Sequence, residues 1–351
     1  GAAAFIMAEY LGVGYGQIII SAAIPALLYY VALYFSIDIE ARRVGLRGLP
    51  KQELPRVKDV LRSGWYLLLP LVLLIYLLVG LDFSPPRAAL YGIGSIFLLQ
   101  AVCRRSLKNL IPAFEEGAKA AIQVATTCAL VGIIVGMIEL TGLGVKLSQG
   151  LIALSGGSLP VLLLVTMAAS LILGMGLPPS ACYITLAILV APTLVQMGVK
   201  PLSAHYFVFM FGIMSMITPP VAISSYVAAS LAGADMFKTG WTAVRIAASS
   251  FIVPFMFVYG PQLLALGSAL EVVATTLAAI VGVWAFSSGV WGWLKTGATL
   301  LERILLLGGG ICLIDPGHLT DLMGAALVSA AILIHLRRLR ALRSVAHGEH
   351  A

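Results

Sequence analysis

The chain alternates between long apolar segments and short polar connections. Apolar stretches lie near residues 15–37, 65–81, 86–102, 120–140, 159–197, 203–233, 244–264, 270–290, 297–314 and 319–336. Because a helix of about 20 apolar residues crosses a membrane, most of these stretches predict one crossing each. The longest have room for two crossings or for a segment that re-enters the membrane. The pattern therefore predicts an all-α polytopic membrane protein.

The composition agrees with this interpretation. Hydrophobic residues make up 60% of the chain and charged residues only 11%, whereas soluble domains carry about 25% charged residues. The net charge of +7 does not indicate a nucleic-acid-binding protein, because the basic residues lie between apolar stretches and not on one face or beside stacking aromatic residues. We expect a lipid bilayer as the surroundings and no nucleic acid partner.

The basic residues are distributed unevenly between the two sides of the predicted membrane. Of 22 lysines and arginines, only Arg87, Lys146 and Lys200 fall on the poorer side when successive loops are assigned to alternate sides. By the positive-inside rule, the richer side is cytoplasmic. Its basic residues are Arg42, Arg43, Arg47, Lys51, Arg56, Lys58, Arg62, Arg104, Arg105, Lys108, Lys119, Lys238, Arg245, Lys295, Arg303, Arg337, Arg338, Arg340 and Arg343.

Two similar segments run in opposite directions through this membrane. GAAAFIMAEYLG at 1–12 resembles AISSYVAASLAG at 222–233, and each precedes an apolar crossing, 15–37 or 244–264. The first crossing ends at a basic loop, whereas the second begins at one. Inverted repeats of this kind build the midplane sites of secondary transporters. The alternative is a chance similarity between alanine-rich helices. If the repeat is genuine, the chain is expected to begin inside its first copy.

The first candidate site is a break in LILGMGLPPSACYITLAILV, residues 171–190. Gly174, Gly176, Pro178 and Pro179 interrupt an apolar run there. Glycine is conformationally permissive and proline lacks a donor, so a continuous helix is disfavoured. The freed backbone groups cannot face lipid. We expect a re-entrant hairpin with its tip at 174–180. Its helix ends would present carbonyls to a cation and amides to an anion.

The second candidate site is a break in FGIMSMITPPVAISSYVAASLAG, residues 211–233. Thr218, Pro219 and Pro220 interrupt a crossing flanked by Ser215, Ser224 and Ser225, and no carboxylate lies between Glu139 and Asp235. Hydroxyls and unwound carbonyls are hard oxygen ligands suited to sodium, and a neutral cage is easier to bury than a charged one. The alternative is that both breaks are proline-kinked structural helices whose Ser and Thr side chains satisfy the backbone.

No motif for catalysis is recognisable elsewhere in the chain. Nucleophile triads, nucleotide-binding loops and metal clusters are not evident, and the cysteines, Cys103, Cys128, Cys182 and Cys312, are widely spaced in apolar sequence. We therefore expect neither an enzyme nor a primary pump. An intramembrane enzyme and a scaffold subunit without its own pathway are the alternatives to a transporter. The Gly308–Gly310 run is expected to allow close helix packing.

The motifs GMGLPPSACY and SMITPPVAISSYVAASLAG resemble those of the large membrane subunit of tripartite ATP-independent periplasmic (TRAP) transporters, and the similarity covers about residues 1–265. Residues beyond 265 resemble the additional helices of the fused permeases that use TAXI-type solute-binding proteins. The resemblance implies an elevator-type permease of the bacterial inner membrane that imports small organic anions. It also implies a periplasmic solute-binding protein, a small membrane subunit that is separate or fused upstream, and sodium as coupling ion with no other cofactor.

Site residues follow from the resemblance motif by motif. The hairpin tip would contribute Gly174, Gly176, Pro178 and Ser180, and the unwound helix Ser215, Thr218, Pro219 and Pro220. Gly174, Ser180 and Thr218 are the expected sodium ligands.

The same resemblance gives the expected domain organisation. The end of a first repeat is expected at 1–37, a basic linker at 38–63, a second repeat at 64–265, further transmembrane helices at 266–340 and a cytoplasmic tail at 341–351. In the second repeat, 64–119 would form scaffold helices and 120–265 transport elements, with the helix break at 218–221.

Overall fold

The computed structural model describes residues 2–46, 48–50, 53–81, 83–102 and 110–348. In this part of the chain the secondary structure is helical, apart from one isolated β-bridge between Trp293 and Gly297. The described helices that are long and apolar enough to cross a membrane number 4, or up to 6 if each of two bent pairs forms one span. The predicted all-α membrane protein is thus confirmed. Among the basic and cysteine residues discussed above, those outside the described residues are Arg47, Lys51, Cys103, Arg104, Arg105 and Lys108.

The central body of the molecule is formed by the short helix α1 and by the helices from α7 to α12. Its elements are α1 (Ala2–Leu11), α7 (Leu143–Ser155), α8 (Leu159–Gly174), α9 (Pro179–Leu189), α10 (Ala191–Gln196), α11 (Pro201–Met214), η4 (Ser215–Ile217) and α12 (Ile223–Ala232). Helix α11 lies at its centre, where Phe207 and Phe211 are fully buried and make edge contacts with each other and with Phe255. Because lipid is as apolar as these side chains, close packing stabilises this core more than burial does.

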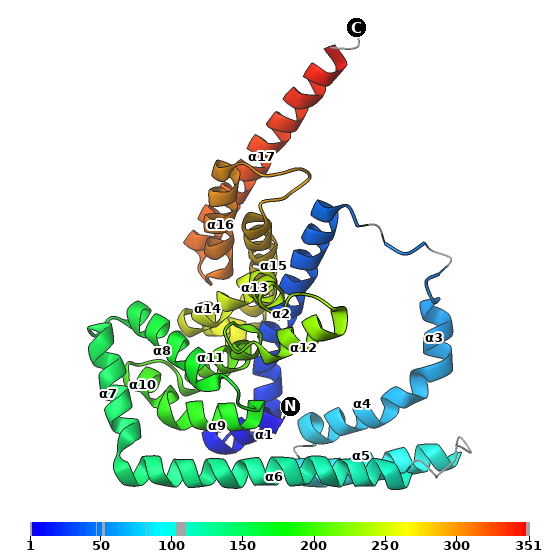
Figure 1. Ribbon diagram of the computed structural model, residues 1–351, viewed down its shortest axis with the longest axis vertical. Coiled ribbons are helices and arrows are strands. Elements are labelled where there is room, and N and C mark those ends of the chain that lie inside the picture. Colours follow the sequence, from blue (N-terminus) through cyan, green and yellow to red (C-terminus); the bar gives the residue numbers. More distant parts are fainter. Residues whose placement is uncertain (1, 47, 51–52, 82, 103–109, 349–351) are drawn as a thin grey trace.

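Residues 57–141 form a second group, which we call the arm. It consists of α3 (Val57–Gly64), η1 (Trp65–Leu68), α4 (Leu69–Ile75), η2 (Tyr76–Gly80), α5 (Pro85–Val102) and α6 (Leu110–Thr141). In Figure 1, α3 and α4 run along one side of the molecule and α6 crosses beneath the other helices. Large apolar side chains of α6 such as Ile111, Ile122 and Leu140 are exposed. Exposed apolar surface of this extent faces lipid or another protein surface.

The remaining helices stand together on the other side of the body. They are α2 (Tyr15–Val44), α13 (Met236–Ile246), η5 (Ala248–Phe251), α14 (Val253–Tyr259), η6 (Pro261–Leu264), α15 (Ala269–Trp291), α16 (Leu300–Ile314) and α17 (His318–Gly348). The glycine run allows close packing, as predicted, because a Cβ on Gly310 would come within 2.7 Å of the Phe286 nitrogen and one on Gly309 within 2.8 Å of Val328.

The two segments that the sequence pairs have the same local structure. Helices α1 and α12 each contain 10 residues, and each is followed by a left-handed glycine, Gly12 at φ 63° and Gly233 at φ 62°. The crossings that follow them differ, because α2 is one continuous helix whereas α13 and α14 are bent by 63° at their junction.

Several helices extend past the expected boundaries. Helix α2 continues beyond residue 37 to Val44, where pairs between Asp38 and Arg42 and between Glu40 and Arg43 stabilise its last turns. Helix α6 runs unbroken through the boundary expected at 119/120, and α17 continues past residue 340. Charged residues are compatible with a helix that has left the apolar zone, so the end of an apolar stretch does not mark the end of its helix.

Candidate functional site

The first break separates α8 from α9. Helix α8 ends at Gly174, the connection passes through Gly176 at φ 80°, and α9 starts at Pro179. Left-handed backbone favours glycine, and proline suits the first turn of a helix because the missing N–H would lack a partner there. The amide of Leu177 donates to the Gly174 carbonyl at 3.3 Å. Helix and break therefore lie where the glycines and prolines predict them.

The second break separates α11 from α12. Helix α11 ends at Met214, a 3-10 turn follows, and the backbone is extended at Thr218. The Pro219–Pro220 peptide bond is cis, and Ala222 adopts φ 34° before α12 begins at Ile223. Two consecutive prolines remove two backbone donors, which disfavours a continuous helix through them.

The structure brings the two breaks into contact through glycine. A Cβ placed on Gly174 would lie 2.7 Å from the Gly212 carbonyl oxygen and 3.0 Å from the Ser215 Oγ. Ser215 is fully buried. The end of α8 therefore lies directly against the last turn of α11, at a separation that no other residue type at 174 allows without displacement.

Hydroxyl groups satisfy three carbonyls at the second break. Ser215 donates to the Gly212 carbonyl at 2.6 Å, and Thr218 donates to the Met214 carbonyl at 2.7 Å. Tyr226 donates to the Pro220 carbonyl at 2.8 Å. A hydroxyl that donates its hydrogen keeps lone pairs on its oxygen. These oxygens are therefore available as ligands for a cation while the backbone stays satisfied.

The predicted site residues do not form one cluster. Gly174 and Ser215 are in contact, and Thr218 is held to Met214 beside them. Pro219 instead packs toward α13, where a Cβ on Gly240 would lie 3.0 Å from its ring, and the Pro220 carbonyl is held by Tyr226.

The other predicted residues lie at the hairpin tip. Gly176 faces open space, with no atom within 4 Å of its Cβ position. Pro178 precedes the first residue of α9, and Ser180 is buried in its first turn. The tip therefore meets the second break through Gly174.

Sequence reasoning missed Gly212 at this contact and two polar residues further along α8. Gly212 lies opposite Gly174, and a Cβ there would also come within 2.5 Å of the Cys182 Sγ. Thr166 and Ser170 are fully buried on α8, and among the described residues their hydroxyl oxygens have no hydrogen-bond partner. The four-residue spacing of Thr166, Ser170 and Gly174 places all three on one helix face, a signal that was readable in the sequence.

Ionisable ligands do not converge in the described part of the chain. It contains no group of three or more His, Cys, Asp or Glu residues that could hold a metal ion. The side chain of Glu139 lies outside the described residues. Any ion at the two breaks would therefore meet neutral oxygens, with the two helix C-termini supplying partial negative charge.

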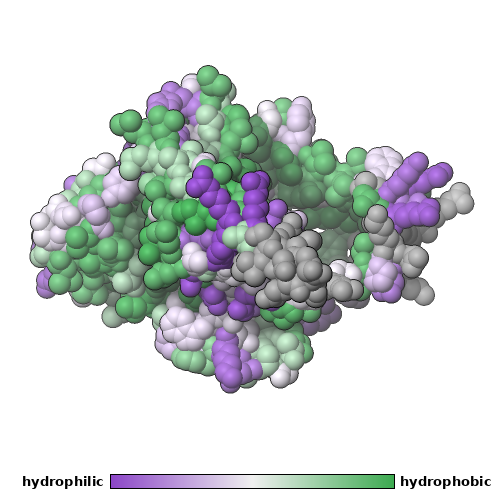
Figure 2. All heavy atoms as spheres, turned by 90° about the horizontal axis from the view of Figure 1, so that it is seen from above, coloured by the Kyte–Doolittle hydropathy of each residue, from purple (hydrophilic) through white to green (hydrophobic). Residues whose placement is uncertain are grey.

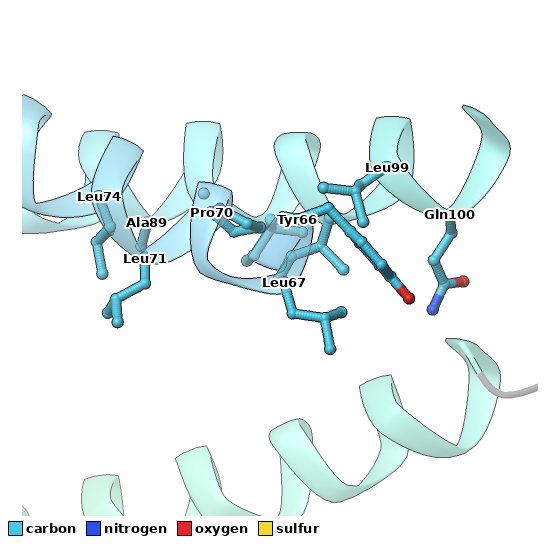
Figure 3. Close-up of a pocket in the computed structure, with 11 residues that line it drawn as sticks. Tyr66, Leu67, Pro70, Leu71, Leu74, Ala89, Leu99 and Gln100 are labelled. Carbon is cyan, nitrogen blue, oxygen red and sulfur yellow. The ribbon is translucent and has the colours of Figure 1, made fainter. Parts of the chain in front are cut away.

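One cavity lies in the arm and another lies beside the second break. One of about 580 Å³ lies between α4 and α5, with leucines along it and Tyr66 and Gln100 at one end (Figure 3). It belongs to the arm and no residue of either break lines it. Another of about 620 Å³ lies between α2 and α11, and Met214, Ile217 and Ser224 line it from the second break. Of these two cavities, the second adjoins the candidate site.

Comparison with known protein families gives a match across most of the chain. The family model of the tripartite ATP-independent periplasmic transporter, DctM component, matches residues 1–272. The chain belongs to this family. It is therefore a TRAP transporter permease, which agrees with the helix breaks and apolar spans, and transport rather than catalysis is the activity of the family. No curated protein and no solved structure matches the chain.

Membership in the TRAP family has consequences for location and partners. TRAP permeases are multi-pass proteins of the bacterial inner membrane that work with a periplasmic binding protein and a small membrane subunit. The matched residues contain both breaks and the arm, and the match ends inside the first turn of α15. Helices α16 and α17 lie beyond it.

Proposed function

We propose that this TRAP permease imports small organic anions, such as carboxylates, together with sodium, and that sodium binds where the two breaks meet. The observation that carries the proposal is the contact of Gly174 with Ser215. Helix α8 ends at Gly174 and α11 ends at Met214, so two helix C-termini converge there. Their partial negative charges favour a cation, and buried neutral oxygens complete its surroundings.

The opposite helix ends suit the anion. Helices α9 and α12 begin at Pro179 and Ile223, on the far side of each break. Helix N-termini carry partial positive charge and free amides, which favour a carboxylate. Ser224, in the first turn of α12, lines the cavity of about 620 Å³. In transporters with broken helices, cations and anionic substrates use these opposite ends.

The transport cycle follows from this arrangement. Sodium bound by the hydroxyls of Ser215 and Thr218 would order the second break and hold the hairpin tip against it. The substrate, delivered by the periplasmic binding protein, would then bind beside the ordered helix ends. The loaded body would move past the scaffold as an elevator, with the hairpin re-entering the membrane. In this proposal, α15–α17 would be the additional helices of the branch that uses TAXI-type solute-binding proteins.

Reconstitution of the complete transporter in liposomes tests the coupling. Uptake of a radiolabelled carboxylate, supplied with its binding protein, should require an inward sodium gradient. Uptake that is indifferent to sodium would exclude the proposed coupling.

A matched pair of variants tests the site. Thr218→Val removes a hydroxyl at the second break, and we expect the sodium concentration for half-maximal uptake to rise about tenfold, the effect of losing one modest ligand. Thr242→Val is the control, because Thr242 also donates to a helix carbonyl, that of Lys238 at 2.8 Å, but on the exposed surface of α13. The site assignment fails if the two variants behave alike.

A further inference from the structure

A separate cavity of about 400 Å³ lies between α2, α15 and α17. Helix α2 packs against α15, and α15 packs against α16, which packs against α17. The cavity lies where α2, α15 and α17 come together. Its volume is within the range of ligand-binding pockets, about 300–1,000 Å³. It shares no residue with the two helix breaks.

Part of the cavity wall is apolar, and Asp38, Ser288 and His335 add polar groups to it. Phe35 contributes from α2, Trp284 from α15 and Ile332 from α17. The surface next to it is also apolar and open to the surroundings, because Tyr34 on the rim is 68% exposed and Leu333, the neighbour of Ile332, is 56% exposed. In a membrane, lipid chains can therefore contact the surface beside the cavity.

The rim of the cavity carries positive charge. Arg42 lies near the end of α2 and Lys295 follows the end of α15, so both stand at the same end of the cavity. Phe35 and Trp284 each lie about two helical turns deeper, which corresponds to about 10 Å. A cationic rim above an apolar wall matches a molecule with an anionic head and a hydrocarbon chain.

The basic side chains at the rim outnumber the acidic ones, because Arg42 and Lys295 face only Asp38 there. Arg42 pairs with Asp38 at 2.9 Å, but a guanidinium has five donors and this pair leaves several of them free. Within the described part of the chain, Lys295 forms no ion pair with a carboxylate. Arg338 lies 3.5 Å from buried Glu302 and donates to the Gly297 carbonyl close by.

Further arginines surround the same end of the molecule. The guanidinium of Arg245 lies 4.2 Å from the centre of the Trp291 ring and that of Arg43 lies 5.7 Å from it. Arg303 donates to the Gly289 carbonyl at 3.0 Å. Figure 2, which looks onto this end, shows hydrophilic residues gathered in a few clusters on a largely hydrophobic surface. The positive-inside rule places this end at the cytoplasmic leaflet, where anionic lipids attract basic residues.

We propose that this cavity binds one anionic phospholipid, whose phosphate contacts Arg42 and Lys295 and whose acyl chain lies along Phe35, Trp284 and Ile332. The lipid joins α2, which belongs to the family-matched residues, to α17, which lies beyond them. It thereby fastens the C-terminal helices to the permease. The site is independent of sodium coupling, so the two proposals can fail separately.

Native mass spectrometry of the purified full chain tests this proposal. After delipidation, the protein is titrated with phosphatidylglycerol and with phosphatidylcholine of identical acyl chains. One phosphatidylglycerol should bind in preference to phosphatidylcholine. Equal affinity for the two lipids would overturn the assignment of an anionic headgroup site.

Two pairs of variants locate the lipid. Ile332→Trp fills the cavity and should reduce phosphatidylglycerol binding at least about tenfold, whereas Leu333→Trp points to the surroundings and should not. Arg42→Gln with Lys295→Gln should weaken phosphatidylglycerol by about 30-fold, or about fivefold for each cation, and weaken phosphatidylcholine less, because its choline cation offsets the charge of its phosphate. Lys238→Gln, an exposed lysine on α13, is the control for charge. Unaltered phosphatidylglycerol binding in both Ile332→Trp and the Arg42→Gln, Lys295→Gln double variant would refute the site. If Ile332→Trp does not fold, the double variant alone decides.

Discussion

The two helix breaks differ in how their backbone is accommodated. At the first break, the absence of a side chain at Gly174 lets the end of α8 lie against α11. At the second break, hydroxyls of Ser215, Thr218 and Tyr226 satisfy the carbonyls that the interrupted helix exposes. The structure of the first break thus depends on the missing side chain at Gly174, and that of the second break depends on side-chain hydrogen bonds.

This difference determines how each break responds to substitution. Overpacking a closely fitted contact displaces backbone and costs about 1–3 kcal/mol, and at Gly174 the two nearest atoms belong to the backbone of Gly212. Removing one hydroxyl costs about 0.5–1.5 kcal/mol and leaves the packing intact. Substitutions at the first break should therefore abolish function, whereas those at the second should weaken it in steps.

The largest effect is expected for Gly174→Ala. The added methyl group would lie 2.7 Å from the Gly212 carbonyl oxygen, so the tip must move away from α11 and open the contact between the breaks. Sodium-driven uptake should fall more than about tenfold. Gly150→Ala is the control, because a Cβ at Gly150 meets no atom within 4 Å. Equal transport rates for these two variants would contradict the role of the close approach.

Ser215→Ala should have the next largest effect. It removes the hydrogen bond to the Gly212 carbonyl at 2.6 Å together with one proposed sodium ligand, but adds no volume. We expect about tenfold weaker dependence of uptake on sodium and a small loss of thermal stability. Ser203→Ala on the preceding helix α11 is matched, since Ser203 is also buried and donates to the Phe257 carbonyl. It should lose stability but keep its sodium dependence.

The position of both breaks was predictable because glycine and proline act locally. A missing amide at Pro179, Pro219 or Pro220 disfavours a continuous helix at that point of the chain. The contact between the breaks was not predictable, because it depends on Gly212, and an isolated glycine within an apolar helix has many explanations. The bend between α13 and α14 also lacks a local signal, since Ala247 and Ala248 occupy the junction.

The sequence likewise indicated which polar residues lie beside the breaks better than which of them meet. Ser215 and Thr218 were identified by their place beside the prolines, and the structure holds both at the end of α11. Pro219 was grouped with them because it is adjacent in sequence, yet it faces α13. Neighbours along an unwound segment turn to different sides, so spacing rules that hold for a helix no longer assign a common face.

Gly240→Ala tests whether the side of the second break that contacts α13 contributes to sodium binding, as the side that contacts α8 is proposed to do. The new Cβ would lie 3.0 Å from the Pro219 ring and 3.3 Å from the Tyr226 ring, so a small shift of α13 accommodates it. We expect a loss of about 1 kcal/mol in the free energy of unfolding, measured by thermal denaturation in detergent. The sodium dependence of uptake should be unchanged, and a change comparable to that of Ser215→Ala would mean that both sides of the break hold the ion.

The smallest effect is expected for Tyr226→Phe. The hydroxyl of Tyr226 donates to the Pro220 carbonyl at 2.8 Å, and the bond is exposed, so water or a neighbouring group replaces it at a cost near the lower limit of about 0.5 kcal/mol. The melting temperature should decrease slightly relative to Tyr30→Phe, whose ring is 68% exposed, and the uptake rate should remain within about twofold. A loss of transport as large as that of Gly174→Ala would show that the second break is as intolerant as the first, and the distinction between space and hydrogen bonding would no longer hold.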